Sequence, residues 1–128
     1  MDRKPIDISE AESLVMDVLW RASAPMPAED VTAALVKEQR WQEATIKTLL
    51  NRLLKKGAVS ASKDGRRYLY SAELKREQWV SRESGTMLDR LFGGRVAPLV
   101  AHFGKHRKLS QADIAELKKL IEELGDGK

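Results

Sequence analysis

The chain has 128 residues, 33% of them charged and 42% hydrophobic, and its formal net charge is +4. This length suits one ordinary domain, or a small domain with an oligomerisation segment. No apolar run approaches the roughly 18–20 residues that span a bilayer, the N-terminus lacks the apolar core of a secretory signal, and the absence of cysteine excludes disulfides and thiolate metal or redox sites. We therefore expect a cytoplasmic protein without membrane insertion.

The positive charge is concentrated in one segment. Residues 1–38 carry a net charge of −4, residues 39–70 carry +6, and residues 71–128 carry +2. Lys and Arg gathered on one module indicate a polyanionic partner such as DNA. A basic face that is merely solvated is the alternative.

The first helix is predicted from Ser9 to about Trp20. Ser9 and Glu12 have the spacing of a capping box, and apolar residues follow at helical spacing. The two prolines in residues 24–27 cannot continue the helix, because each lacks a backbone donor and restricts the residue before it.

Two further helices are expected before the middle of the chain. The second should start near Ala28 and end before Trp41. The third should run from Glu43 or Ala44 to Lys56, with Gly57 as its C-cap. Leucines and Ile46 form one face of this third helix. The opposite face is polar and basic, with Lys47, Thr48, Asn51, Arg52 and Lys55.

A β-hairpin is predicted next. The pattern changes to strand period at Val59, a turn is expected at Lys63-Asp64-Gly65, and a second strand includes Tyr68-Leu69-Tyr70. Asp-Gly between short strands is a strong local hairpin signal. The tip would carry the cations Lys63, Arg66 and Arg67.

Three more helices are expected in the C-terminal part. The first covers Leu74 to Phe92 and is broken by Gly93-Gly94, and the second covers Val96 to Phe103. The last should start at Ser110, three residues before Asp113, and end at Gly125. Its apolar residues recur at three- and four-residue spacing, which suits a partner helix.

The predicted order of three helices followed by a hairpin indicates a winged helix-turn-helix domain over residues 1–73. The fold class is mainly α with a small β-hairpin. The third helix would enter the major groove of DNA and the hairpin would contact the minor groove or the backbone. The candidate DNA-binding residues that this pattern gives are Lys47, Thr48, Asn51, Arg52, Lys55, Lys63, Arg66 and Arg67. Since winged helices also bind proteins, an interaction module without specific DNA binding is the alternative function.

Residues 74–128 are expected to form a helical dimerisation domain. Their apolar seams are too narrow for a good core, and two copies packed together would bury them. The alternative is that these helices fold back on their own N-terminal domain. The candidate dimerisation residues are Leu88, Leu91, Phe92, Leu99, Phe103, Ile114, Leu117, Ile121 and Leu124.

The chain resembles the penicillinase repressor family (BlaI/MecI type) from about Ile8 to Leu124. The N-terminal resemblance lies in Ile8-Ser9-Glu10-Ala11-Glu12, Val15-Met16 and Leu19-Trp20. The rest lies in Trp41, the run from Thr45 to Leu53, Lys55-Lys56-Gly57, Gly65-Arg66, Tyr68 and Tyr70.

The resemblance implies a homodimer that binds a palindromic operator and blocks transcription. It implies that Thr45, Lys47, Thr48 and Arg52 face the DNA, with Arg66 and Arg67 on the wing. The family has Ser-Pro-Lys where this chain has Gln42-Glu43-Ala44, so the operator preference does not carry over.

The resemblance also implies a regulatory route. Some family members are cleaved just before a Phe in a short apolar helix of the dimerisation domain, and the matching bond here is His102–Phe103. A membrane sensor protease is therefore a candidate partner.

An enzyme is not expected. His102 and His106 have the spacing of a pair of metal ligands, but Gly104 weakens that helix, and Lys105, Arg107 and Lys108 would repel a cation. We expect no metal and no cofactor. Trp20 and Trp41 are expected to pack in a core or between domains, and the role of Trp79 stays open.

Overall fold

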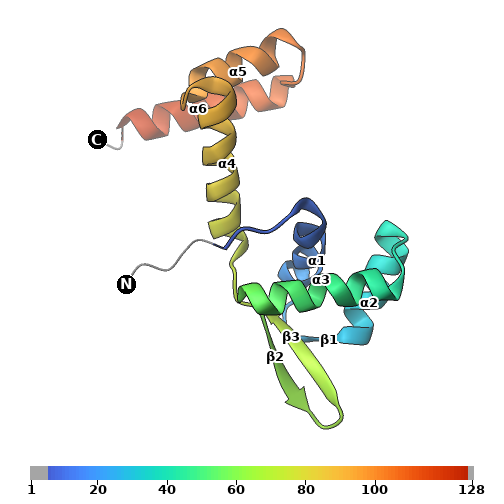
Figure 1. Ribbon diagram of the computed structural model, residues 1–128. Helices are drawn as coiled ribbons and strands as arrows, with labels where there is room; N and C mark the ends of the chain where they lie inside the picture. Colours follow the sequence, from blue (N-terminus) through green and yellow to red (C-terminus); the bar gives the residue numbers. More distant parts are fainter. Residues whose placement is uncertain (1–5, 127–128) are drawn as a thin grey trace. The chain divides into compact units, whose positions relative to one another are not determined.

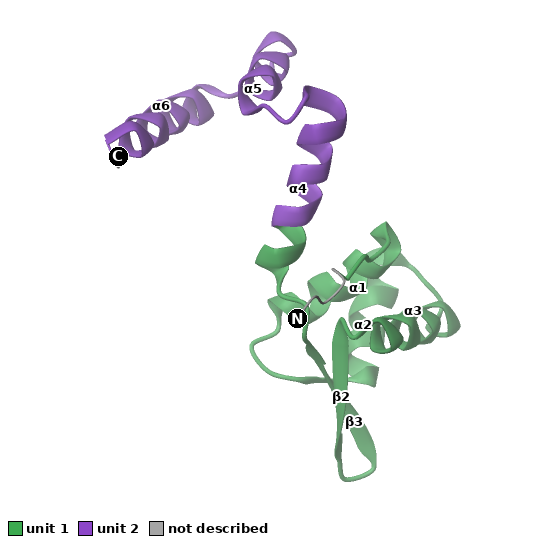
Figure 2. Ribbon diagram, turned by 60° about the vertical axis from the view of Figure 1, so that its left-hand side comes forward, with its two compact units in different colours: residues 1–80 green, residues 81–128 purple. Residues whose placement is uncertain are grey.

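The computed structural model describes residues 6–126 and divides the chain into two compact units, residues 1–80 and residues 81–128 (Figures 1 and 2). The boundary falls inside a helix, α4. The elements before it are α1 (Glu10–Arg21), β1 (Met26–Pro27), α2 (Ala28–Gln39), α3 (Glu43–Lys56), β2 (Val59–Asp64) and β3 (Arg67–Ala72). They are followed by α4 (Arg76–Phe92), α5 (Val96–Lys105) and α6 (Gln111–Asp126). The predicted fold class, helices with one small sheet, is confirmed.

Helix α1 begins with the capping box that the sequence predicts. The Ser9 hydroxyl accepts a hydrogen bond from the Glu12 backbone at 3.1 Å, and the Glu12 carboxylate accepts one from the Ser9 backbone at 2.8 Å. Two of the unpaired N–H groups at the helix start are satisfied in this way. The helix ends at Arg21, ahead of the prolines.

The sheet has three strands in the order β1-β3-β2, all antiparallel. The sequence predicted the β2–β3 hairpin but not β1, whose two residues pair with Tyr70 and Leu69. The turn also differs from the prediction. Asp64 pairs with Arg67, so β2 extends through Asp64 and the turn is Gly65-Arg66, with Gly65 at a φ of 66°. Glycine reaches this conformation without steric cost.

The hydrophobic core lies in unit 1. It gathers apolar side chains from α1, α2, α3 and the start of β2, together with Leu74. The helix predicted to begin at Leu74 begins two residues later, at Arg76, because the N–H groups of Glu73 and Leu74 donate to the Ala58 carbonyl at the start of the hairpin. The core consists of Val15, Met16, Val18, Leu19, Val31, Leu35, Ile46, Leu49, Leu50, Leu53, Ala58, Val59 and Leu74.

Unit 2 has a different character. Within the described residues, none of α4, α5 and α6 has a buried side chain, and several large apolar residues are exposed. Helix α6 begins with reciprocal hydrogen bonds between Ser110 and Asp113, as predicted. It passes through Gly125 and ends at Asp126, so the predicted end at Gly125 is wrong by one residue. No described helix is long and apolar enough to cross a membrane.

Candidate nucleic-acid interface

Helix α3 presents one polar face on a rigid apolar base. Ile46, Leu49, Leu50 and Leu53 are at most 5% exposed and hold the helix against the core. A helix anchored by four such side chains keeps its other face in a fixed orientation. The five residues predicted for that other face are all exposed, and so is Thr45, which the resemblance added; the five are Lys47, Thr48, Asn51, Arg52 and Lys55.

The C-terminal end of α3 is fixed by Gly57 and Lys56. Gly57 takes a φ of 80°, and its N–H donates to the carbonyls of the last helical turn. The ammonium of Lys56 donates to the Asp7 carbonyl at 2.8 Å and to the Glu12 carboxylate. These bonds join the end of α3 to the start of α1.

Glu12 is a buried acid, with only 1% of its surface exposed. Burial opposes its ionisation, but the hydrogen bonds from Lys56 and Ser9 outweigh that effect and lower the pKa of Glu12 below its ordinary value. The carboxylate is therefore charged at neutral pH and is paired with Lys56.

Helix α2 links α3 to the hairpin. Glu29, in the first turn of α2, lines a groove between α2 and α3 together with Glu43 and Lys47. The same carboxylate lies 3.9 Å from the guanidinium of Arg67, the first residue of β3. The start of α2, the start of α3 and the hairpin therefore contribute to one surface.

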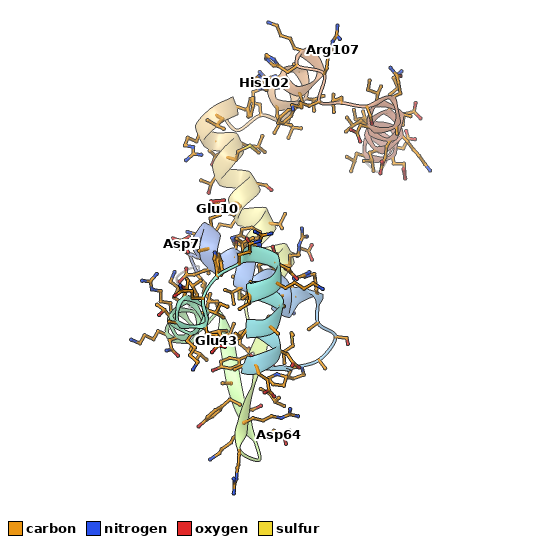
Figure 3. All side chains as sticks on the ribbon, turned by 90° about the vertical axis from the view of Figure 1, so that its right-hand side faces the viewer. Asp7, Glu10, Glu43, Asp64, His102 and Arg107 are labelled. Carbon is orange, nitrogen blue, oxygen red and sulfur yellow. The ribbon has the colours of Figure 1, made fainter. Side chains whose placement is uncertain are left out.

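The cations predicted for the hairpin are all exposed to solvent. Lys63, Arg66 and Arg67 are all exposed, and Asp64 lies with them near the tip (Figure 3). Arg67 contacts two acids, Asp64 at 3.8 Å and Glu29, whereas Thr48 donates its hydroxyl to the Ala44 carbonyl at 2.9 Å. The Thr48 hydroxyl keeps its acceptor lone pairs, and the guanidinium of Arg67 keeps further N–H donors for other partners.

Sequence reasoning noted Glu43 as an acid at the start of α3 but assigned neither Glu43 nor Glu29 to this surface. Both occupy the first turn of a helix, where carboxylates are favoured by the helix dipole. The sequence placed them on their helices but gave no sign that they border the same groove.

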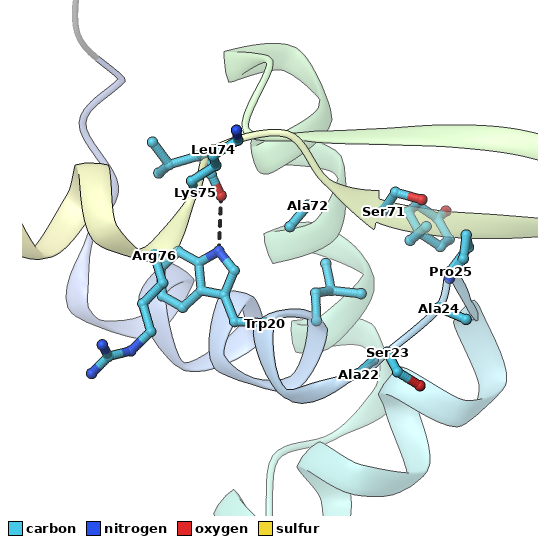
Figure 4. Close-up of a pocket in the computed structure, with 12 residues that line it drawn as sticks. Trp20, Ala22, Ser23, Ala24, Pro25, Ser71, Ala72, Leu74, Lys75 and Arg76 are labelled. Atoms are coloured by element: carbon cyan, nitrogen blue, oxygen red, sulfur yellow. Dashed lines mark hydrogen bonds between the residues drawn. The ribbon is translucent and has the colours of Figure 1, made fainter.

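A second open groove in unit 1 lies beside Trp20 (Figure 4). The Trp20 indole donates to the Leu74 carbonyl at 2.8 Å and packs on the ring of Trp79, with 5.5 Å between ring centroids. Trp79 therefore packs beside α1, a position that the sequence left open. Trp20 and Trp41 both pack against the core, as expected.

In unit 2 the two histidines lie side by side. The rings of His102 and His106 are 4.5 Å apart, and His102 also packs near Phe92 and Phe103. Among the described residues no three His, Cys, Asp or Glu side chains come together in a way that could hold a metal ion.

Three helices, a β-hairpin and an exposed polar face on the third helix define a winged helix-turn-helix DNA-binding protein. The solution structure of the DNA-binding domain of the repressor BlaI resembles the chain with a TM-score of 0.54 and 36% identity, over 60% of this chain and 93% of that one. The BlaI monomer of Bacillus licheniformis in complex with the blaP half-operator is similar, with a TM-score of 0.51 and 37% identity over 61% of this chain and 93% of that one.

The sequence comparisons cover nearly the whole chain. Residues 8–123 match the model of the penicillinase repressor family. The penicillinase repressor of Bacillus licheniformis is 34% identical over 121 residues, which is 94% of each chain. The chain therefore belongs to the penicillinase repressor family, whose members are transcriptional repressors and not enzymes.

Proposed function

We propose that this protein represses transcription as a homodimer that binds a palindromic DNA operator. One observation carries the proposal: the fold of unit 1 is shared with a BlaI monomer solved in complex with half of an operator, at 37% identity. A half-operator for one chain fits a dimer that occupies two symmetry-related half-sites. Such a dimer acts on the chromosome, so we place it in the cytoplasm.

Nine exposed side chains form the proposed DNA contact. Helix α3 enters the major groove, since an α-helix fits its width of roughly 12 Å. Thr45, Thr48 and Asn51 are suited to base edges, and the cations of α3 to phosphates or to guanine. Lys63, Arg66 and Arg67 on the hairpin contact the adjacent backbone or minor groove. The cations of α3 in this set are Lys47, Arg52 and Lys55.

The dimer is proposed to form through the C-terminal helices. We propose residues 1–73 as the DNA-binding domain and residues 74–128 as the dimerisation domain, although Leu74 and Trp79, at the start of the second domain, pack on unit 1. The support is the exposure of the apolar seam, with Leu91 at 59%, Ile121 at 65% and Leu124 at 73%. Apolar surface of this kind is costly in water and indicates a partner. The other six members, Leu88, Phe92, Leu99, Phe103, Ile114 and Leu117, are partly exposed.

Cleavage at His102–Phe103 by a membrane sensor protease is the proposed release mechanism. The bond lies inside α5, a ten-residue helix without a buried side chain. Such a helix opens easily, as a protease requires. Co-expression with that protease and its inducer should yield two fragments, and a chain that stays intact would contradict the mechanism.

DNA binding is tested by selecting duplexes from a randomised library with the full chain and measuring the dissociation constant at two salt concentrations. We expect one palindromic consensus and a steep loss of affinity with salt. Arg52→Ala should weaken consensus binding by roughly tenfold or more. Lys75→Ala removes an exposed cation outside this surface and should leave binding unchanged. If no consensus emerges, the chain is an interaction module instead.

Dimerisation is tested by sedimentation equilibrium. Ile121→Asp places a carboxylate in the proposed seam, and we expect the dimer dissociation constant to rise by roughly thirtyfold or more, because a buried unpaired charge is costly. Glu122→Ala, on the neighbouring exposed position, is the control. A wild-type protein that sediments as a monomer would contradict the dimer.

A further inference from the structure

The polar face of α3 begins with an acid. Glu43 is the first residue of the helix and is exposed, and the side chain of the preceding Gln42 makes no capping hydrogen bond. Within the described part of the chain, no hydrogen bond or ion pair engages the Glu43 carboxylate. A hydrogen-bond acceptor is therefore available at the N-terminal end of α3. In helix-turn-helix complexes this end of the corresponding helix lies closest to the base edges.

Glu43 also lies within the surface proposed to contact DNA. It borders the groove between α2 and α3, and Lys47 follows it one turn later on the same side. In Figure 3 Glu43 lies on the part of unit 1 nearer the hairpin, whereas Glu10 lies on the part farther from it. A carboxylate on this surface would approach a polyanion.

The chemistry of the carboxylate restricts its partner. Phosphate oxygens repel it, and it can only accept hydrogen bonds. In the major groove the exocyclic amine of cytosine is the donor that Glu matches, whereas guanine and thymine present acceptors to the same space. Adenine also has an amine, but its neighbouring N7 is an acceptor that favours an amide side chain.

We propose that Glu43 is a specificity-determining residue that accepts a hydrogen bond from the N4 amine of a cytosine in each half-site. The inference rests on the proposed function. In this proposal Glu43 weakens binding to half-sites that lack the cytosine amine, and it also weakens binding to non-specific DNA.

The test repeats the library selection with wild type, Glu43→Gln and Glu43→Ala, each as the full chain. For wild type we expect a cytosine at one position of each half-site, preferred by at least about fivefold over the other bases. Glu43→Gln should shift that preference towards adenine, because an amide pairs with adenine N6 and N7. Glu43→Ala should lose the preference and bind non-specific duplex more tightly.

The matched control is Glu10→Gln. Glu10 is also an exposed acid at the first position of a helix, but it belongs to the end of α1 that meets the far end of α3. Glu10→Gln should leave the preferred base at each position of the selected half-site unchanged. A role of Glu43 in helix stability alone would lower the thermal midpoint and all affinities together, without changing the preferred base.

The outcomes separate the two proposals. If wild type selects a consensus and Glu43→Gln selects the same one, the cytosine contact is overturned while the repressor function stands. If wild type selects no consensus, both are overturned.

Discussion

The two units of this chain differ in how their apolar residues are used. Among the described residues of unit 1, thirteen hydrophobic side chains are buried, and all of them lie between Val15 and Leu74. In unit 2, three helices have apolar stripes, but none of their described side chains is buried. The extensive contacts between described elements are all formed in unit 1. Unit 1 therefore has a hydrophobic core of its own, whereas the apolar side chains of unit 2 remain exposed, which is the surface that the proposed dimer would cover.

The largest expected effect comes from the same substitution made in both units. Leu53 is fully buried in α3, and Leu124 is 73% exposed in α6. Leu53→Ala should lower the free energy of unfolding of unit 1 by about 3 kcal/mol, through lost transfer energy and a cavity. Leu124→Ala should change it by less than about 0.5 kcal/mol.

The unfolding of unit 1 can be followed separately by tryptophan fluorescence during denaturant unfolding. Trp20, Trp41 and Trp79 all belong to unit 1, so their emission follows that unit alone. Circular dichroism reports the helices of both units. If Leu124→Ala shifted the fluorescence transition as far as Leu53→Ala, α6 would contribute to the core of unit 1 and the comparison would fail.

A smaller effect is expected at the ion pair that joins α1 to α3. Glu12→Gln keeps the shape of the side chain but removes its charge. Breaking a fully buried pair costs about 3–5 kcal/mol, but Lys56 is 38% exposed and regains water, so we expect a loss of about 1–2 kcal/mol at pH 7.

The pH dependence of this loss has a definite sign. The pKa of Glu12 is lowered by folding from its ordinary value of 4.5. The ionised form therefore stabilises the fold above that value, and this stabilisation is lost as the pH falls through the lower, folded-state pKa. The difference between wild type and Glu12→Gln should shrink from pH 7 to pH 3. A difference that stays constant over this range would show that the charge of Glu12 contributes nothing.

The parts of unit 1 that depend on local sequence were predictable. The capping box at Ser9, the C-cap at Gly57 and the residues of the exposed face of α3 follow from short-range rules. The missed features depend on distant contacts. β1 is a strand only because β3 lies beside it, and Leu74 lies outside the predicted helix because its N–H donates to the distant Ala58 carbonyl at 3.0 Å.

The same distinction holds for the candidate site. Helical periodicity assigned Thr48 and Arg52 to the exposed face, because a helix fixes the direction of each side chain. It could not find Glu29, which becomes part of the site only where α2, α3 and the hairpin meet. Residues that join a site from another element have no local signal in the sequence.

The smallest expected effect concerns that residue. Glu29→Gln removes an acid from the proposed DNA surface and leaves Arg67 with one neighbouring acid, Asp64, in place of two. We expect DNA affinity to rise by about two- to fivefold at low salt, because one carboxylate fewer repels the phosphates and one acid fewer competes for Arg67. The gain should fall as salt rises, because exposed charges are screened.

Glu38→Gln provides the matched control for this prediction. Glu38 lies near the other end of α2 and also pairs with an exposed arginine, Arg21, at 2.9 Å. Both substitutions therefore remove one charge and one surface ion pair from the same helix, and neither should alter stability by more than about 1 kcal/mol. If both variants gained affinity equally, the effect would be one of net charge and not of position. A gain confined to Glu29→Gln would place the start of α2 at the DNA, beside α3 and the hairpin.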